Sequence, residues 1–194
     1  MSNSSPPAAP LPSAADDHRA VAAEFTATVE SVDAGSWDVP APVDGWTARD
    51  VVAHLIEWLQ SFVEGQTEVE FPPGPGVAED PAGAWRVHSA AVQAILDDPV
   101  AAGRTYEFGH IGPMSLGAAI AMIYTPDVFL HRWDLARATG LDETLDPDRC
   151  AAMYEGMLPM DDVLRQSGQY GPKVAVPDDA DPQTKLLAFI GRTP

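Results

Sequence analysis

The sequence predicts an all-α protein: a four-helix bundle with a short helical and irregular extension at its C-terminal end. Apolar residues recur at every third or fourth position over long stretches, which is the spacing of one face of a helix. Connections rich in Pro and Gly separate these stretches. Segments that alternate apolar and polar residues are scarce, so strands contribute little to the predicted fold.

Length and charge restrict the class of protein. A chain of 194 residues can bury a sizeable core. We expect one domain over 16–194, after a disordered tail over 1–15 where Ser, Pro and Ala dominate. The net charge of −18 comes from 29 acidic and 11 basic residues. Such a surface repels phosphate backbones and anionic lipids, which argues against nucleic-acid and membrane partners.

Neither secretion nor membrane insertion is expected. The N-terminal segment lacks the basic and apolar regions of a signal peptide. No apolar run reaches the roughly 18 residues that a membrane span requires. The single cysteine, Cys150, cannot form an internal disulfide and is expected to be a small buried or half-buried residue. We therefore expect a cytoplasmic protein.

Two amphipathic helices are expected in the first third of the chain. Phe25 and Val29 belong to an apolar repeat with helical spacing over 16–32. After a Pro-rich connection, Thr47 and Asp50 have the spacing of a capping box, in which each side chain bonds the backbone amide of the other residue. The second helix is expected to begin there.

The middle of the chain combines a loop, a helix and a connection. Clustered prolines predict a loop over 71–83, and the apolar spacing that follows predicts a third helix over Trp85–Leu96. Residues 99–114 form a Gly- and Pro-rich connection, with one short extended piece expected at Thr105–Phe108.

The fourth and longest helix is expected to begin after Ser115, as its N-cap, and to end at Gly140. Thr125, Pro126 and Asp127 offer an alternative, because they have the order of an N-cap and the first two residues of a new helix.

Two further helical segments are expected towards the C-terminal end. Asp146 and Pro147 open the first, which extends to about Arg165. The second is a short closing helix over 182–190.

The fourth helix carries the polar residues of greatest chemical interest. Asp127, His131 and Asp134 are spaced i, i+4 and i+7, so on a helix all three point the same way. Side chains four residues apart can bind one metal ion, and His54 on another helix can supply a third ligand. Three protein ligands leave open positions, as in catalytic sites. The alternative is that His54 is a core histidine and Asp127 merely begins a helix.

A buried carboxylate needs a partner, because an unpaired charge in an apolar environment is costly. A cation would satisfy Asp127. Asp134 is expected to have a structural role or to support a ligand, and Arg137 or Arg49 could neutralise it.

Three segments resemble the DinB-like superfamily, and within it the mycothiol-dependent maleylpyruvate isomerase N-terminal domains and their single-domain metal-binding relatives. The segments are DGWTARDVVAHLIEW (44–58), FGHIGPMSLGAAIAMIYTPDVFLHRWDLARATG (108–140) and YGPKVAVPDDADPQTKLLAFIGR (170–192). The resemblance begins near residue 18 and covers most of the chain.

The resemblance implies a single divalent metal site. In that superfamily, a His of the second helix and a pair spaced four apart on a later helix bind the metal. His54 falls on the first position, and Asp127 and His131 fall on the pair, which is Glu and His in the isomerase. The implied metal is zinc, with nickel or iron as alternatives, and the implied cofactor is mycothiol. Asp127 is one methylene shorter than the isomerase's Glu, and Pro126 beside it can kink the helix.

Two residues are predicted to assist catalysis at such a site. Tyr124 lies three residues before Asp127, where it could donate a proton or stabilise an oxyanion; the alternative is a core aromatic. His110 precedes the fourth helix and could reach the mouth of the site; the alternative is a solvated loop residue. His88 and His18 look incidental to function.

Three functions are compatible with these observations. The first is a metal-dependent transferase or isomerase that uses a low-molecular-weight thiol. The second is a metal-dependent hydrolase, dehydratase or cyclase that acts on a specialised metabolite without a thiol. The third is a non-catalytic binding protein with a degenerate metal site. We expect a small-molecule substrate, and a homodimer is compatible with the resemblance.

Overall fold

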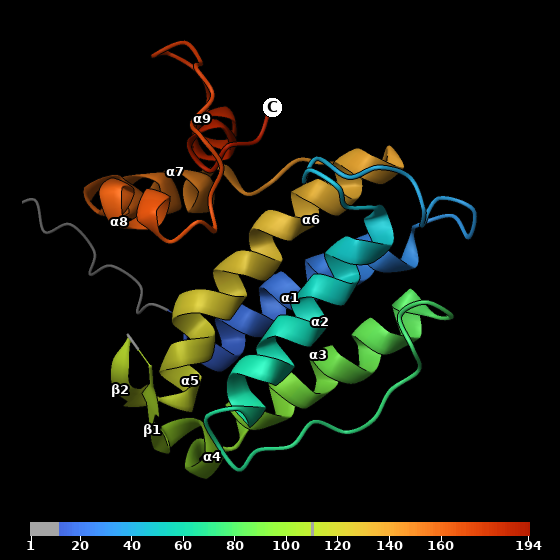
Figure 1. The fold of residues 1–194 in the computed structure, drawn as a ribbon, viewed down its shortest axis with the longest axis vertical. Coiled ribbons are helices and arrows are strands. Elements are labelled where there is room, and N and C mark those ends of the chain that lie inside the picture. The colour runs from blue at the N-terminus through green and yellow to red at the C-terminus, as the bar shows by residue number, and fades with distance from the viewer. Residues whose placement is uncertain (1–11, 110) are drawn as a thin grey trace, which may run out of the picture. The chain divides into compact units, whose positions relative to one another are not determined.

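The computed structural model describes residues 12–109 and 111–194, and this part of the chain is mostly helical (Figure 1). One small sheet of two strands accompanies the helices. The predicted predominance of helices is confirmed, whereas the four-helix arrangement stays a prediction. In the described part of the chain, none of the helices has the length and apolar character needed to cross a membrane.

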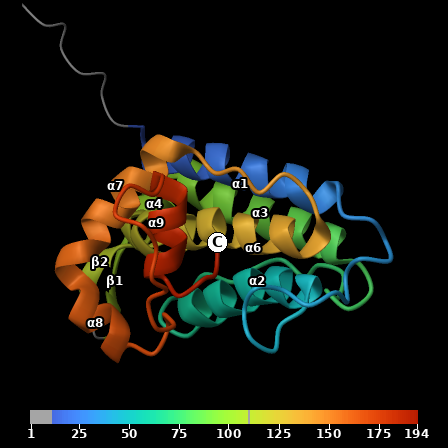
Figure 2. The same ribbon diagram turned by 90° about the horizontal axis from the view of Figure 1, so that it is seen from above.

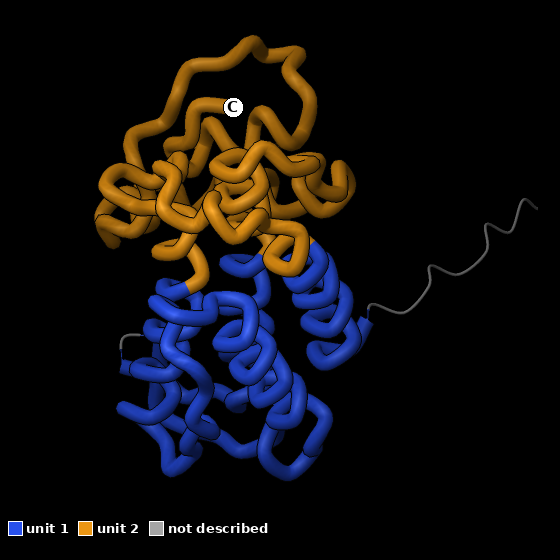
Figure 3. Tube along the Cα trace, turned by 90° about the vertical axis from the view of Figure 1, so that its right-hand side faces the viewer, with its two compact units in different colours: residues 1–27, 53–128 blue, residues 28–52, 129–194 orange. Residues whose placement is uncertain are grey.

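The chain forms two compact units (Figure 3). Of the described residues, unit 1 comprises 12–27, 53–109 and 111–128, and unit 2 comprises 28–52 and 129–194. The border between them falls inside three helices, which are α1 (Ala14–Glu30), α2 (Ala48–Glu64) and α6 (Thr125–Thr139). Each of these helices therefore contributes residues to both units.

Unit 1 contains most of α1 and α2 together with α3 (Pro81–Asp97), which packs against α1 (Figures 1 and 2). The rings of Phe25 on α1 and Trp85 on α3 are 4.5 Å apart, and both side chains are fully buried. The indole Nε1 of Trp85 donates to Thr26 Oγ1 over 2.8 Å, so the polar atom of this buried ring is satisfied.

The predicted first and second helices are confirmed. The side chain of Asp50 accepts from the backbone N–H of Thr47 over 2.7 Å, and the backbone N–H of Asp50 donates to Thr47 Oγ1 over 3.3 Å. This is the predicted capping box at the start of α2. Gly45 precedes it with a φ of 77°, a conformation that favours glycine.

The predicted third helix begins four residues earlier than expected. Asp80 is the N-cap of α3, because its carboxylate accepts from Gly83 N over 2.8 Å, and Pro81 occupies the first helical position. Proline is favoured there, since the first amide of a helix has no intrahelical partner. The proline and glycine that predicted a longer loop are therefore part of the helix start.

The connection after α3 has more structure than the sequence predicted. The extended piece at 105–108 is confirmed as β1 (Thr105–Phe108), which pairs antiparallel with β2 (Gly112–Ser115). The short helix α4 (Pro99–Gly103) precedes β1 and is capped by Asp98, whose carboxylate accepts from Val100 N over 2.8 Å. The prediction missed both α4 and β2.

The predicted fourth helix is continuous but changes its helical type. Ser115 caps α5 (Leu116–Ala119), a π-helical turn spans Ile120–Tyr124, and α6 continues to Thr139, before Gly140 with a φ of 70°. The backbone N–H of Thr125 donates to the carbonyl of Ile120, five residues back. Pro126 explains the wider turn, because it has no N–H and its ring would clash with the carbonyl four residues before it. Thr125 is helical, so the alternative of a new N-cap there is wrong.

Unit 2 contains most of α6 and the C-terminal helices, in which α7 and α9 pack together. These helices are α7 (Pro147–Met157), the 3-10 turn η2 (Leu158–Met160), α8 (Asp161–Gln166) and α9 (Pro182–Phe189). The predicted fifth helix is interrupted at η2, where Pro159 removes a backbone donor. The predicted closing helix is confirmed and begins after the N-cap Asp181. Cys150 is buried in this unit, and burial raises the pKa of its thiol to about 11.

Candidate metal centre

The carboxylate of Asp127 has two partners on α2. Its Oδ2 lies 3.3 Å from Nε2 of His54 and accepts a hydrogen bond of 2.9 Å from Nε1 of Trp58. The side chains of His54 and Asp127 are about one-third and one-quarter exposed, at 31% and 26%. The indole therefore fixes the orientation of a carboxylate that solvent and small solutes can still reach.

His131 follows Asp127 by one turn of α6. Ligand atoms of His54, Asp127 and His131, one from each side chain, all lie within 4.8 Å of one another. In the described part of the chain, no other group of three or more such residues satisfies that condition. The three predicted ligands are thus brought together.

The donor set suits a divalent ion. Imidazole nitrogen and carboxylate oxygen are ordinary ligands of zinc and of related first-row metals. Bonds of about 2.0–2.2 Å place neighbouring ligand atoms roughly 3–3.5 Å apart in a tetrahedral site. The 3.3 Å between His54 and Asp127 has this spacing before any adjustment. Three protein ligands leave at least one position for another molecule.

His131 contacts Asp134 and Trp46 in unit 2, and Arg192 in turn holds Asp134. Its Nδ1 lies 2.9 Å from Oδ2 of Asp134, and its ring stacks on Trp46 with centroids 5.6 Å apart. Asp134 is fully buried and receives two hydrogen bonds from Arg192, from Nε over 2.7 Å and from Nη2 over 2.9 Å. The predicted supporting role of Asp134 therefore has a geometric basis.

This arrangement determines which nitrogen of His131 is available as a ligand. Burial acts to raise the pKa of Asp134, but the hydrogen bonds from His131 and Arg192 outweigh it and hold the pKa below its ordinary value. An ionised carboxylate only accepts, so Nδ1 of His131 must carry the proton. Nε2 then carries the lone pair with which His131 would bind a metal, and a carboxylate behind a ligating histidine is the usual arrangement.

The predicted cationic partners of Asp134 are wrong. Arg137 bonds Glu143 over 2.6 Å, and Arg49 pairs with Asp38 over 3.1 Å. The cation that pairs with Asp134 is Arg192, which lies in the segment that follows α9. In the sequence, Arg192 is recognisable only as a basic residue directly after the apolar closing helix. That position does not indicate which acidic residue it pairs with.

Tyr124 is fully buried, and its hydroxyl bonds Nε2 of His88 over 2.9 Å. Its ring also meets the edge of Trp58, with centroids 5.7 Å apart. Burial, and then the charge of Asp127, raise the pKa of Tyr124 well above its ordinary value. The phenol therefore stays protonated, while its catalytic role stays a prediction. His110 lies outside the described residues.

His88 and His18 are integral to the core of unit 1, although the sequence made them look incidental. Phe71 stacks on the ring of His88 at 5.3 Å, and Nδ1 of His18 lies 3.4 Å from Oγ1 of Thr125. Burial lowers the pKa of His88 to about 3 and that of His18 to about 4. Both imidazoles are therefore neutral at physiological pH. Patterns of single residues could not reveal this, because neither histidine has a partner nearby in sequence.

The chain is similar to a known protein family and to two curated proteins. Residues 18–136 match the family model described as mycothiol maleylpyruvate isomerase N-terminal domain. Two proteins of Mycobacterium tuberculosis, from strains CDC 1551 / Oshkosh and ATCC 25618 / H37Rv, are each 28% identical over 191 residues. The aligned region covers 91% of this chain and 96% of each relative, and both are named as uncharacterized proteins. No solved structure gives a significant match.

Proposed function

The chain belongs to the DinB-like family of mycothiol maleylpyruvate isomerase N-terminal domains, and from this premise we propose that it is a divalent-metal-dependent transferase or isomerase. In this proposal, His54, Asp127 and His131 are the metal ligands. Zinc is the first candidate for the metal, followed by nickel and iron. The convergence of the three ligand atoms within 4.8 Å is the observation that carries the proposal.

A divalent ion held there would lower the pKa of a bound thiol or water and would polarise a carbonyl group. The family description makes mycothiol the first candidate for the thiol. Trp58 orients Asp127, and Asp134 keeps the proton of His131 on Nδ1. These residues keep the ligands in one geometry while the half-buried side of the centre admits a small-molecule substrate.

The test of the ligand set is metal content after purification without chelator. We expect His131→Ala to abolish metal retention, because the centre loses one of three ligands. His88→Gln is the matched control: it also replaces a buried histidine, while its amide can still bond the hydroxyl of Tyr124. It should retain metal at the wild-type ratio. Circular dichroism establishes that both variants are folded.

Two outcomes would reject the metal proposal. One is equal metal content in the His131 and His88 variants; the other is a wild-type protein that binds no divalent ion on titration. For the thiol, the measurement is the melting temperature of the metal-loaded protein with and without mycothiol. A ligand that binds the native state must raise it. An unchanged melting temperature, with metal retained, would favour the thiol-independent hydrolase, dehydratase or cyclase.

A further inference from the structure

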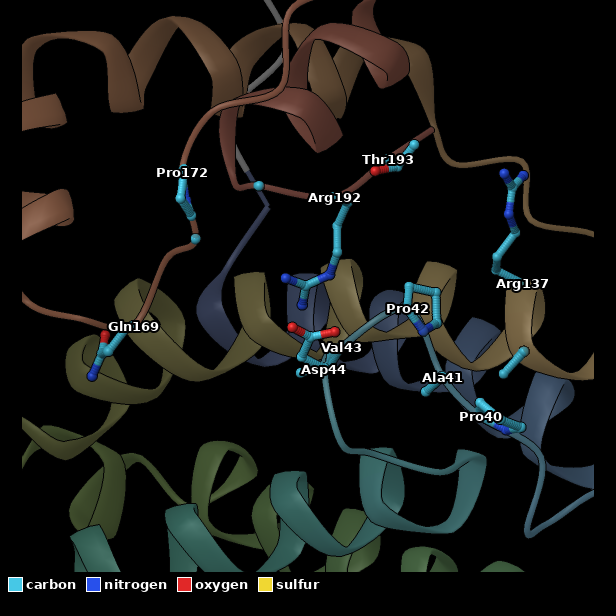
Figure 4. A pocket seen from close by; sticks show the side chains of 13 residues that line it. Pro40, Ala41, Pro42, Val43, Asp44, Arg137, Gln169, Pro172, Arg192 and Thr193 are labelled. Atoms are coloured by element: carbon cyan, nitrogen blue, oxygen red, sulfur yellow. The ribbon is translucent and has the colours of Figure 1, made fainter.

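A second candidate binding site lies in unit 2. It is a cavity of about 680 Å³ that we call the C-terminal cavity, lined by the segment 40–44, the end of α6 and the segments around 169–172 and 191–193 (Figure 4). Its volume is in the range of small-molecule sites. The polar side chains that matter below are those of Asp44, Arg192, Gln169 and Thr193.

Hydrogen bonds within the chain fix the C-terminal wall of this cavity. Arg165 donates to the carbonyls of Gly171 and Phe189, and so joins the two segments of the wall. Gly191 crosses Gly171 so closely that a Cβ on Gly191 would lie 2.8 Å from Gly171 Cα, and its φ of 90° also favours glycine. The wall is therefore formed before any ligand arrives, which lowers the entropic cost of binding.

The opposite wall is a tight turn. The backbone N–H of Ala41 donates to Trp46 O over 2.8 Å, and that of Trp46 donates to Val43 O over 3.0 Å. Pro40 and Pro42 further restrict the backbone of this segment. The turn presents the carboxylate of Asp44 opposite the guanidinium of Arg192 (Figure 4).

Charge decides which ligand this cavity suits. Arg192 is already paired with the buried Asp134, and Arg137 at the far end is paired with Glu143. Asp44 adds a negative charge of its own to the lining. The lining therefore offers no excess positive charge to an anion, and the chain as a whole carries a net charge of −18.

Hydroxyl groups of a ligand match the donors and acceptors that the polar side chains of the lining offer. A guanidinium only donates and a carboxylate only accepts, so a pair of them facing one another suits a group that does both. Neighbouring hydroxyls on one ring can accept from Arg192 and donate to Asp44. Gln169 and Thr193 add groups that donate and accept. We propose that the C-terminal cavity binds a neutral ligand rich in hydroxyl groups, such as a sugar or cyclitol ring.

Titration of the full chain with D-glucose tests this proposal, with succinate as an anionic probe of smaller size. Chemical shifts of the side-chain Nε–H of Arg192 report on the site. We expect saturable shifts with glucose and none with succinate. Asp44→Ala should weaken glucose binding by about tenfold, because it removes a charged acceptor. Asp162→Ala removes an exposed acid of α8 outside the lining and should leave glucose binding unchanged.

Absence of saturable glucose shifts, tighter binding of succinate, or an unaltered affinity in the Asp44 variant would each overturn the proposal. The outcome is separate from that of the metal centre, because Asp44 is not among its ligands. Asp44→Ala is therefore expected to keep the wild-type metal content. If the protein binds glucose but takes up no metal, the proposal for the C-terminal cavity is supported and only the proposed metal-dependent function is rejected.

Discussion

At the scale of single residues, the centre depends on the pairing of Asp134 with Arg192. A fully buried carboxylate without its cation would be protonated or would strongly destabilise the fold. If Asp134 were protonated, its carboxyl group could itself donate, and Nδ1 of His131 would no longer have to be the donor. Arg192 therefore acts through Asp134 on His131, the proposed metal ligand, although Arg192 lies outside residues 18–136 that match the family model.

This chain of contacts predicts the effect of Arg192→Gln on metal affinity. We expect the dissociation constant for zinc to rise by about tenfold to a hundredfold, the usual range for loss of a group behind a ligating histidine. Arg192→Lys keeps the charge and should recover part of the affinity. Competition with a chromophoric chelator measures both values.

Arg137→Gln provides the matched control. It removes an arginine from the same cavity lining, but that arginine bonds Glu143 and not Asp134. Its zinc affinity should equal that of the wild type. If Arg192→Gln also binds zinc with wild-type affinity, the pairing has no influence on the ligand.

The three proposed ligands and the supporting role of Asp134 could be predicted from the sequence, whereas the cationic partner of Asp134 could not. Asp127 and His131 share a helix, so the helical repeat alone relates them. His54 was a candidate because it lies on another apolar helix, and the family resemblance was needed to favour it over a core histidine, because spacing carries no information between helices. Arg192 is 58 positions from Asp134, and nothing in the local pattern pairs them. Arg137 and Arg49 were the partners that the sequence suggested, and both pair with other carboxylates.

At the scale of elements, the start of α2 is the most clearly specified feature. Thr47 and Asp50 satisfy each other's backbone amides there, two turns before His54. Thr47→Ala should lower the free energy of unfolding by about 1 kcal/mol, the usual value for loss of an N-cap side chain. Thr47→Ser keeps the hydroxyl and should cost far less. Urea denaturation followed by circular dichroism distinguishes the two, and equal losses would mean that the hydroxyl contributes nothing.

Other element boundaries depend on contacts that periodicity does not encode. The π-helical turn at Ile120–Tyr124 keeps the helix continuous past Pro126, where local propensity allows a break equally well. In α3, Pro81 and Gly83 read as loop residues, but the Asp80 side chain makes them the first turn of a helix. Strand β2 was missed because Gly112 and Pro113 have low strand propensity, while pairing with β1 supplies its stability.

At the scale of the whole molecule, two neutral histidines in the core link stability to pH. Burial, together with the proximity of His18, lowers the pKa of His88 to about 3, and burial lowers that of His18 to about 4. In the unfolded chain both return to their ordinary value of 6.5. Between pH 6.5 and 4 the unfolded chain therefore binds up to two more protons than the native one, and stability rises with pH over that range.

Acidification from pH 6.5 to 5 should therefore increase the unfolding constant by up to about tenfold per pH unit for each histidine. This window lies above the range in which most carboxylates titrate, so the histidines dominate the slope. His88→Gln removes one of the two groups, because glutamine does not titrate, while its amide can still bond Tyr124. Urea midpoints of the metal-free wild type and variant at pH 7.5, 6.5 and 5.5 measure the difference. We expect a shallower loss of stability in the variant; parallel curves would show that His88 gains its proton without unfolding, and that its burial in the core of unit 1 imposes no pH dependence on the fold.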